Sequence, residues 1–190
     1  MLNNNPMTRE EAHKLLLDHV KNPKMLVHSY ASEAVMKGLA RRLGKDEEKW
    51  GMTGLLHDID VEVTNADPKT HALVAVDILR KAGIWEDMID AIKMHNEMAT
   101  GMPRINEFQH ALAAGETITG LIYATALVYP DKKIKDVKPS SITKRMKQSA
   151  FAASVSRENI MECEMIGIPL QEFVEISLDA MKGVAEEIGL

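Results

Sequence analysis

The sequence of 190 residues contains no apolar run long enough to cross a membrane, and it has only one cysteine, Cys163. A membrane-spanning helix needs roughly 18 or more apolar residues in succession, so none is expected. A single cysteine excludes an internal disulfide bond and is typical of a reducing cytoplasm. The first residues, MLNNNPMTREE, also lack the charged-then-apolar order of a secretory signal. We therefore expect a cytoplasmic protein that does not associate with a membrane.

Positive charge is not in surplus either, because 28 acidic residues outnumber 23 lysines and arginines and give a net charge of −5. Acidic and basic residues are interspersed, which argues against the basic face that binds a nucleic-acid backbone. We therefore expect no nucleic-acid scaffold among the partners. Hydrophobic residues make up 45% and charged residues 27% of the chain, as in ordinary globular domains, and the length suits one domain with a full core.

Alternation of apolar and polar residues, which marks a half-buried strand, is missing over any useful length, whereas helical spacing recurs. The stretch TREE is a capping box with Thr8 as N-cap and Glu11 three residues later. Asp67 and Pro68 mark the start of a helix in DPKTHALVAVDILRKAG. We expect an all-α fold, a single-domain helical bundle. Its predicted parts are a disordered N-terminal lead at 1–7, one helical domain at 8–190, helices at about 24–43, 46–56 and 107–128, a loop at YPDKKIKDVKPSS and C-terminal helices at about 140–190.

Histidines are few, but four of the seven lie on apolar faces of predicted helices. A single histidine in such a position is more often a core residue with satisfied nitrogens than a metal ligand. Four of them in one small domain leave many buried polar nitrogens to satisfy at once. A shared metal centre would satisfy them together, because neutral imidazole is a common ligand of divalent metals. The four are His28, His57, His71 and His95.

The order of His28, then His57 beside Asp58 in the stretch LLHDID, then a carboxylate on a later helix resembles the HD-domain superfamily of metal-dependent phosphohydrolases. The chain is similar to the HDIG branch, with HDID in place of HDIG, and the resemblance covers about residues 20–128. His71 and His95 resemble the additional ligands of relatives that hold two metals. The resemblance implies an HD-type bundle with one or two divalent ions (Mn, Fe, Mg, Ni, Co or Zn). The implied ligands are His28, His57, Asp58, Glu116, His71 and His95.

Three positions depart from the pattern of that family. Glu116, in the stretch LAAGETITGLI, occupies the place of the usual aspartate ligand. Glutamate is one methylene longer but is also a hard oxygen ligand, and the alternative is a surface residue of an amphipathic helix. Asn96 replaces the second of two consecutive histidines, and Val61 occupies a position where many relatives have a lysine.

The resemblance implies hydrolysis of a nucleotide or another small phosphate ester by a metal-activated water. Asp58 would be a shared ligand and a catalytic residue, and Asp60 or Glu62 would donate a proton, although both acids also fit a solvated loop. The charge of a phosphate calls for cations near the site. The candidates for substrate binding are Lys93, Arg104, Lys144 and Arg145, of which the last two, in SITKRMK, also fit a solvated helix face.

Two other classes of function stay open at this point. A non-catalytic, metal-stabilised module that binds a ligand would tolerate both Val61 and Glu116. Some HD-fold proteins hold two irons and oxygenate a substrate. The stretch LIYATALVYP is more apolar than a solvated helix requires, which fits a core position or a homodimer face. The expected partners are a small phosphorylated substrate and, if that face is exposed, a second copy of the chain.

Overall fold

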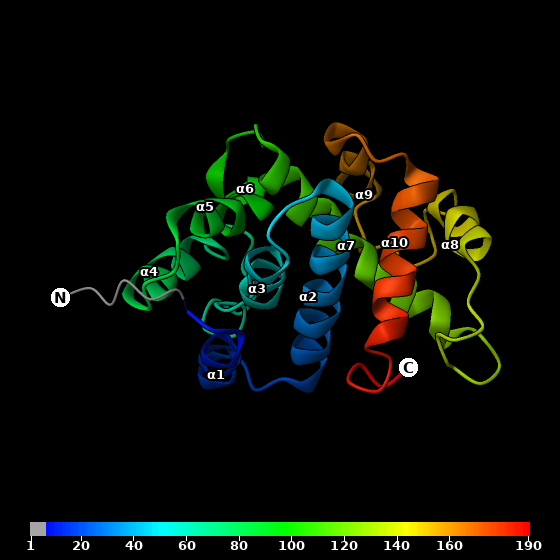
Figure 1. Cartoon of the computed structure of the whole chain (residues 1–190), viewed down its shortest axis with the longest axis horizontal. Helices are drawn as coiled ribbons and strands as arrows, with labels where there is room; N and C mark the ends of the chain where they lie inside the picture. Colours follow the sequence, from blue (N-terminus) through cyan, green and yellow to red (C-terminus); the bar gives the residue numbers. More distant parts are fainter. Residues whose placement is uncertain (1–6) are drawn as a thin grey trace.

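In the computed structural model, which describes residues 7–190, every regular element within that range is a helix (Figure 1). This confirms the predicted all-α fold. The predicted disordered lead at 1–7 lies outside the described residues except for Met7, which packs against the core. The α-helices are α1 (Arg9–His19), α2 (Pro23–Leu43), α3 (Glu47–Leu56), α4 (Leu73–Lys81), α5 (Glu86–His95), α6 (Glu97–Thr100), α7 (Glu107–Leu127), α8 (Pro139–Met146), α9 (Arg157–Met161) and α10 (Leu170–Gly183), and a 3-10 helix, η1 (Glu162–Ile166), follows α9.

Polar residues and a glycine set the ends of the first helices. The backbone N–H of Thr8 donates to the Glu11 carboxylate at 2.8 Å, and the N–H of Glu11 donates to Thr8 Oγ1 at 3.2 Å, which completes the capping box of α1. Asn22 caps α2, and Asp46 caps α3. Gly44, with a φ of +66°, ends α2 in the left-handed conformation that glycine adopts without steric cost. Local signals in the sequence thus determine where α2 begins and ends.

The helix predicted to begin at Asp67 begins later, at Leu73, so this part of the prediction is wrong. Residues 68–72 form successive turns, and Asp67 Oδ1, just before them, accepts the backbone N–H of Lys69 at 3.0 Å instead of capping a helix. Ala72 has a φ of +74°, which is incompatible with the interior of a right-handed helix. His71 consequently lies in a turn before α4, and not on the apolar face of that helix.

The central helix is α2, and α3, α7 and α10 pack around it (Figure 1). Gly54 allows α3 to approach α2, because a Cβ atom at this position would lie 2.5 Å from Ser32 O. Gly115 has the same effect on α7, since a Cβ atom there would lie 3.0 Å from Met36 Sδ. These close contacts draw α3 and α7 toward one stretch of α2. The buried apolar side chains form a cluster around them, and its large members include Leu16, Met36, Leu39, Leu55, Leu112 and Phe173.

The apolar stretch LIYATALVYP forms the C-terminal part of α7 and the turn that follows it. Leu121, Ile122 and Ala126 are fully buried, which accounts for much of its apolar character. Leu127 and Val128, at the end of the helix, are 44% and 55% exposed. Neither α7 nor any other helix within residues 7–190 combines the length and the apolar character needed to cross a membrane.

A buried carboxylate connects the start of α1 to α2. Glu33 is 5% exposed. Its carboxylate accepts two hydrogen bonds from the Arg9 guanidinium, at 3.0 and 2.9 Å, and lies 3.1 Å from Lys37 Nζ. Burial alone would raise the pKa of the Glu33 carboxyl, but the hydrogen bonds from Arg9 and Lys37 outweigh it and hold that pKa below its ordinary value. The folded protein therefore protonates Glu33 less readily than the unfolded chain does.

We predict that Glu33→Gln lowers the free energy of unfolding at neutral pH by about 1.5–3 kcal/mol, the range for hydrogen bonds to charged groups. Because the folded-state pKa of Glu33 is depressed, its contribution is fully present above the unfolded-state value of about 4.3. That contribution is lost as the pH falls through the folded-state pKa. Urea unfolding at several pH values should therefore show the difference between variant and wild type shrinking in acid.

The matched control for this measurement is Glu48→Gln. Glu48 lies 3.5 Å from the same lysine, Lys37, but its side chain is 66% exposed. An exposed ion pair contributes about 0–1 kcal/mol, so this variant should remain close to the wild type at every pH. Equal losses of stability in the two variants would contradict the role assigned to Glu33.

Candidate metal centre

Four histidines and one aspartate meet in a single cluster, although they come from separate parts of the fold. His28 lies in α2, and His57 directly follows the last residue of α3. Asp58 is the next residue along the chain, in a turn. His71 lies in the turn before α4, and His95 is the last residue of α5. The histidines therefore lie more at helix ends and in turns than on the four helix faces that the sequence predicted.

Asp58 is at the centre of this cluster. Its Oδ1 atom is 3.0 Å from Nε2 of His71, 3.4 Å from Nε2 of His57 and 3.5 Å from Nε2 of His95. Its Oδ2 atom is 3.7 Å from Nε2 of His28. The side chains form two groups that could each hold a metal ion, one with His28 and His57 and the other with His71 and His95. Asp58 belongs to both groups.

The Nε2 atoms of the four imidazoles face one another in two close pairs. They are 3.1 Å apart between His28 and His57, and also 3.1 Å apart between His71 and His95. Two nitrogens at this distance need a proton or a metal ion between them, because two facing lone pairs would repel. The hydrogen bonds on the other side of each ring decide which nitrogen carries the lone pair.

The Nδ1 atoms of His57 and His95 each donate to a backbone carbonyl in the last turn of the preceding helix. His57 Nδ1 lies 2.8 Å from Gly54 O, and His95 Nδ1 lies 2.5 Å from Ile92 O. A carbonyl oxygen can only accept, so the hydrogen is on Nδ1 in both rings. Nε2 then carries the lone pair of the neutral ring. Burial lowers the pKa of His57 to about 3, which keeps this ring neutral at physiological pH.

Thr119 on α7, which is not among the residues predicted from the sequence, fixes the orientation of the His28 ring in the same way. The Thr119 hydroxyl donates to Glu116 O at 2.6 Å, so its oxygen is left to accept from His28 Nδ1 at 3.0 Å. Nε2 of His28 therefore faces the cluster. The signal available in the sequence was the spacing of three residues between Glu116 and Thr119, which places both on one side of a helix.

Asp60 orients His71 and also caps α4. Its Oδ1 atom accepts from His71 Nδ1 at 2.8 Å, and its Oδ2 atom accepts the backbone N–H groups of Ala72 and Ala75, both at 2.9 Å. The side chain is fully buried. The sequence offered Asp60 as a proton donor, but both oxygens are already engaged. We therefore reassign Asp60 as a positioning residue, a carboxylate that fixes the orientation of a candidate ligand histidine.

Asn96 supports the same turn from the other side. Its side-chain N–H group donates to the carbonyl oxygens of Pro68 and His71, both at 2.9 Å. The residue that departs from the family pattern of two consecutive histidines is thus a structural one in this chain. It holds the irregular segment before α4 beside the end of α5, where His95 lies.

In the cluster, burial and the neighbouring charged groups shift the pKa values of Asp58 and His71 in opposite directions. Burial alone would raise the pKa of Asp58, but the neighbouring imidazoles, His57 first among them, hold it well below its ordinary value. Burial would lower the pKa of His71, but its hydrogen bonds to Asp58 and Asp60 outweigh burial and raise that pKa to about 10. A proton therefore resides on His71 when no metal competes for its nitrogen, and a bound metal ion would displace it.

This donor set fits a divalent metal ion on chemical grounds. Two nitrogens 3.1 Å apart can share an ion at ordinary nitrogen–metal bond lengths of about 2.0–2.1 Å, with the two bonds at roughly a right angle. The Asp58 carboxylate adds a hard, anionic oxygen within reach of both pairs. A cation would remove the repulsion between the lone pairs of His28 and His57, and between His71 and His95 it would take the place of the proton on His71.

Glu116, in the middle of α7, lies beside the cluster and does not point to solvent. Its Oε2 atom is 3.6 Å from His28 Nε2, and its side chain is 16% exposed. Thr117 Oγ1 donates to its other oxygen, Oε1. Burial raises the pKa of the Glu116 carboxyl. The part of Glu116 as a metal ligand stays a prediction, supported by its distance from His28.

Glu62, the second acid predicted as a proton donor, is engaged on the surface. Its Oε1 atom accepts the backbone N–H groups of Lys21 and Asn22, at 2.7 and 2.6 Å. These bonds connect the turn after α3 to the segment that leads into α2. They lower the pKa of the Glu62 carboxyl, which makes it a poorer proton donor near neutral pH. We assign it a structural role.

Arg104 is also structural, which corrects its predicted part in substrate binding. The residue is 6% exposed. Its guanidinium donates to Met94 O at 2.9 Å and to His95 O at 3.1 Å, and it forms an ion pair with Glu162 of η1. The side chain therefore fixes the C-terminal end of α5, and with it His95, and has no free donor face for a phosphate.

The remaining predicted cations lie on two helices. Lys93 is half-buried on α5. Lys144 and Arg145 lie on α8, which packs against α7 and α10. Lys144 is exposed, whereas Arg145 donates to Ser141 O at 3.0 Å and lies over the Phe151 ring. A part of these three residues in substrate binding stays a prediction.

Comparison with known families finds the HD domain, which matches residues 25–131. This range is more than half of the chain and contains all six predicted metal ligands. The curated relatives found are named Ribonuclease Y. The protein of Nitratidesulfovibrio vulgaris is 40% identical over 73 residues, which cover 38% of this chain and 14% of the relative. The protein of Fusobacterium nucleatum is 26% identical over 135 residues, which cover 70% of this chain and 26% of the relative.

The chain therefore matches only a minor part of the length of these relatives. A comparison with solved structures gave no match.

We predict that Asp60→Asn weakens metal binding about 10- to 100-fold, the usual effect of losing a residue that orients a ligand histidine. Asparagine keeps the size of the side chain but loses the charge and one of the oxygens that accept from His71, Ala72 and Ala75. Calorimetric titration of metal-free protein with Mn²⁺ measures the change. Glu62→Gln is the control and should bind Mn²⁺ as the wild type does. If it weakened binding as much as Asp60→Asn, the roles assigned to the two acids would be wrong.

Proposed function

The chain belongs to the HD domain family, and we propose that it is a metal-dependent phosphohydrolase that acts on a small phosphate ester at the Asp58 cluster. The observation that carries this proposal is the orientation of the four imidazoles. Each commits Nδ1 to an oxygen and turns Nε2 toward Asp58. Proteins fix ligand histidines in this way at metal sites, where the Nδ1 partner sets the tautomer.

The residues around Asp58 would divide between two ions. One ion would be held by His28, His57 and Asp58, with Glu116 as a further ligand, and the other by Asp58, His71 and His95. Imidazole nitrogens favour transition metals such as Mn, Fe, Co, Ni or Zn over Mg. When bound, such ions polarise a phosphoryl oxygen and lower the pKa of water at the site.

The protein's own side chains determine how the site treats a phosphate. Neutral imidazoles add no charge, and the two ligand carboxylates, Asp58 and Glu116, offset only half of the charge of two divalent cations. The loaded site therefore attracts an anionic substrate. Thr119 and Asp60, through His28 and His71, keep the ligand nitrogens in place. That rigidity preserves the geometry on which electrostatic stabilisation of a phosphoryl transition state depends.

A small phosphorylated compound, such as a nucleotide, suits this chain better than a long polyanion. The net charge of −5 opposes non-specific binding of a nucleic acid. RNA phosphodiesters are nevertheless a second candidate, because the relatives named Ribonuclease Y share up to 40% identity with this chain over 73 residues. The match covers only 14% of that relative, so the analogy rests on a small part of its length.

We predict that protein purified without chelator contains a transition metal and, with added Mn²⁺, releases phosphate from p-nitrophenyl phosphate or nucleoside monophosphates. Asp58→Ala should lower kcat/KM by more than about 100-fold, beyond the range for residues outside the ligand shell. The variant should keep its helical circular dichroism while metal analysis shows loss of the ion. Asp67→Ala, at an exposed acid in the turn before α4, is the control and should keep both metal and activity.

Other outcomes would favour other functions. Near-wild-type turnover by Asp58→Ala would contradict a metal-dependent hydrolase at this site. Cleavage of short RNA without hydrolysis of small esters would favour the second candidate. Inactivity of the metal-loaded wild type towards every phosphoester, with tight ligand binding retained, would favour a binding module. A mixed-valent iron signal with substrate-dependent consumption of oxygen would favour an oxygenase.

A further inference from the structure

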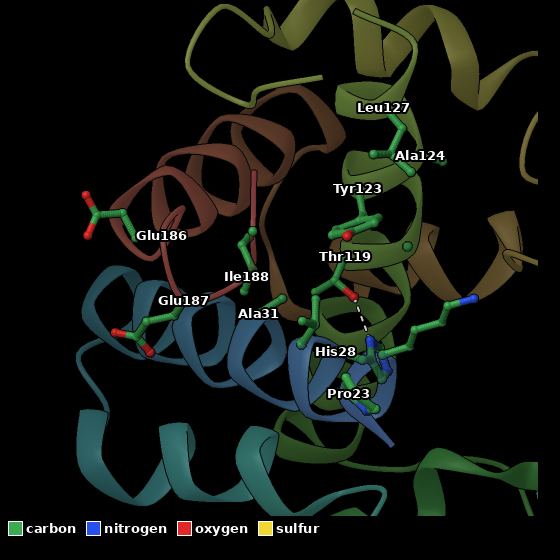
Figure 2. A pocket seen from close by; sticks show the side chains of 14 residues that line it. Pro23, His28, Ala31, Thr119, Tyr123, Ala124, Leu127, Glu186, Glu187 and Ile188 are labelled. Atoms are coloured by element: carbon green, nitrogen blue, oxygen red, sulfur yellow. Dashed lines mark hydrogen bonds between the residues drawn. The ribbon is translucent and has the colours of Figure 1, made fainter. Parts of the chain in front are cut away.

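A groove of about 740 Å³ lies beside the candidate metal centre. Its walls come from α2, from α7 and from the segment after α10, as Figure 2 shows. This volume is within the range of about 300–1,000 Å³ that is usual for sites of small organic ligands. Of the candidate ligands only His28 lines the groove, so the groove meets the cluster at this residue.

The groove and the metal centre meet at His28 and Thr119. Both residues line the groove, and the hydrogen bond between them is drawn in Figure 2. Nε2 of His28 faces the cluster, whereas the opposite edge of its ring and the Thr119 hydroxyl form the start of the groove. The Nδ1 hydrogen and the hydroxyl hydrogen are already used. This end of the groove therefore borders the metal centre without offering a strong donor of its own.

The interior of the groove is mostly apolar. Its side walls carry Val27, Ala31, Tyr123, Ala124, Leu127 and Ile188. Tyr123 and Ala124 are half-buried, so part of their apolar surface stays in contact with solvent inside the groove. Covering such surface with an apolar group is favourable, because it removes apolar surface from water. Tyr123 also offers an aromatic ring, which packs best against another ring.

The charges on the groove are separated in space. Lys24 precedes His28 by four residues in α2, so both lie on the same side of that helix. Lys24 is therefore at the end of the groove that is near the metal centre. Glu186 and Glu187 lie on the far side of the groove from His28 (Figure 2). A phosphate is thus favoured near His28, while a second anionic group farther along would be repelled.

The segment after α10, which forms one wall of the groove, is held in place by packing and by backbone hydrogen bonds. Ile188 is fully buried and Leu190 is 6% exposed. The backbone N–H of Ile188 donates to Val184 O at 3.1 Å, and that of Leu190 donates to Ala185 O at 2.9 Å. This segment lies outside residues 25–131, the part that matches the HD domain. The groove is therefore completed by a segment that family membership does not account for.

We propose that this groove is a specificity site that binds the uncharged, aromatic part of the substrate while the phosphate lies at the metal centre. The proposal rests on the function proposed above and deepens it. A flat ring system, such as a nucleobase or a naphthyl group, can pack against Tyr123 and exclude water from Val27 and Ala124, which are half-buried. A bis-phosphorylated compound would place its second charge towards Glu186 and Glu187 and is rejected.

The test uses a variant in which a larger side chain fills the groove, and it compares the activity of that variant towards two substrates. In Ala124→Phe a ring replaces the methyl group on the groove wall. Ala150→Phe makes the same substitution at an exposed position outside the groove and is the control. The ratio of kcat/KM for 1-naphthyl phosphate to kcat/KM for glycerol 2-phosphate should fall at least about tenfold in Ala124→Phe, equivalent to about 1.4 kcal/mol. The control should keep the wild-type ratio.

A binding measurement separates the groove from catalysis. Metal-free protein is titrated with 1-naphthol, whose own fluorescence reports binding, and bound naphthol is then displaced with adenosine. Saturable binding by the wild type and by Ala150→Phe, weakened at least about tenfold in Ala124→Phe, supports the proposal. Equal binding by all three proteins, or none by the wild type, overturns it.

The two readouts distinguish the failure of either proposal. If neither ester is hydrolysed while naphthol still binds in the groove, the proposed function fails and the binding site stands. If both esters are hydrolysed and the ratio is the same in all three proteins, the specificity site is wrong and the hydrolase stands. Should Ala124→Phe fail to fold, Leu127→Trp replaces it, because Leu127 lines the same groove and is 44% exposed.

Discussion

The hydrogen bonds at Nδ1 of the four clustered histidines determine where the second nitrogen of each ring points. Two acceptors are carbonyl oxygens in the last turns of α3 and α5, where helix geometry leaves carbonyls without a backbone partner. The same bond thus completes a helix end and turns Nε2 toward Asp58. A histidine that caps a helix and a histidine that binds metal are usually alternative interpretations. In His57 and His95 the same side chain serves both roles.

The fold supplies the positions that these bonds require. Gly54 brings α3 against α2, and Gly115 brings α7 against the same helix. Those contacts place His57 and Thr119 on either side of His28, within hydrogen-bonding distance of its ring. Asp60 contacts residues that come later in the sequence. Its carboxylate caps α4 and also orients His71.

The helical fold and the identity of the clustered residues could be predicted because both depend on local signals. Caps such as Asn22 and Asp46 mark helix ends, and the His-Asp pair is a recognisable motif. The functions of Asp60, Arg104 and Thr119 could not be predicted, because each depends on a partner that only tertiary packing brings near. The predicted start of α4 is wrong for a related reason. Asp67 stands before a proline, as a helix cap often does, but the carboxylate of Asp60, which is more distant in the sequence, caps α4 instead.

The most direct test of this account is a crystal structure of the protein grown with Mn²⁺, with the ions located by anomalous scattering. We expect an ion bound to Nε2 of His28 and His57 and to an oxygen of Asp58, at bond lengths of about 2.0–2.4 Å. A second ion is expected on His71 and His95, with Asp58 shared between the two. Ions bound elsewhere, or an Asp58 cluster that stays without metal in excess Mn²⁺, would contradict it.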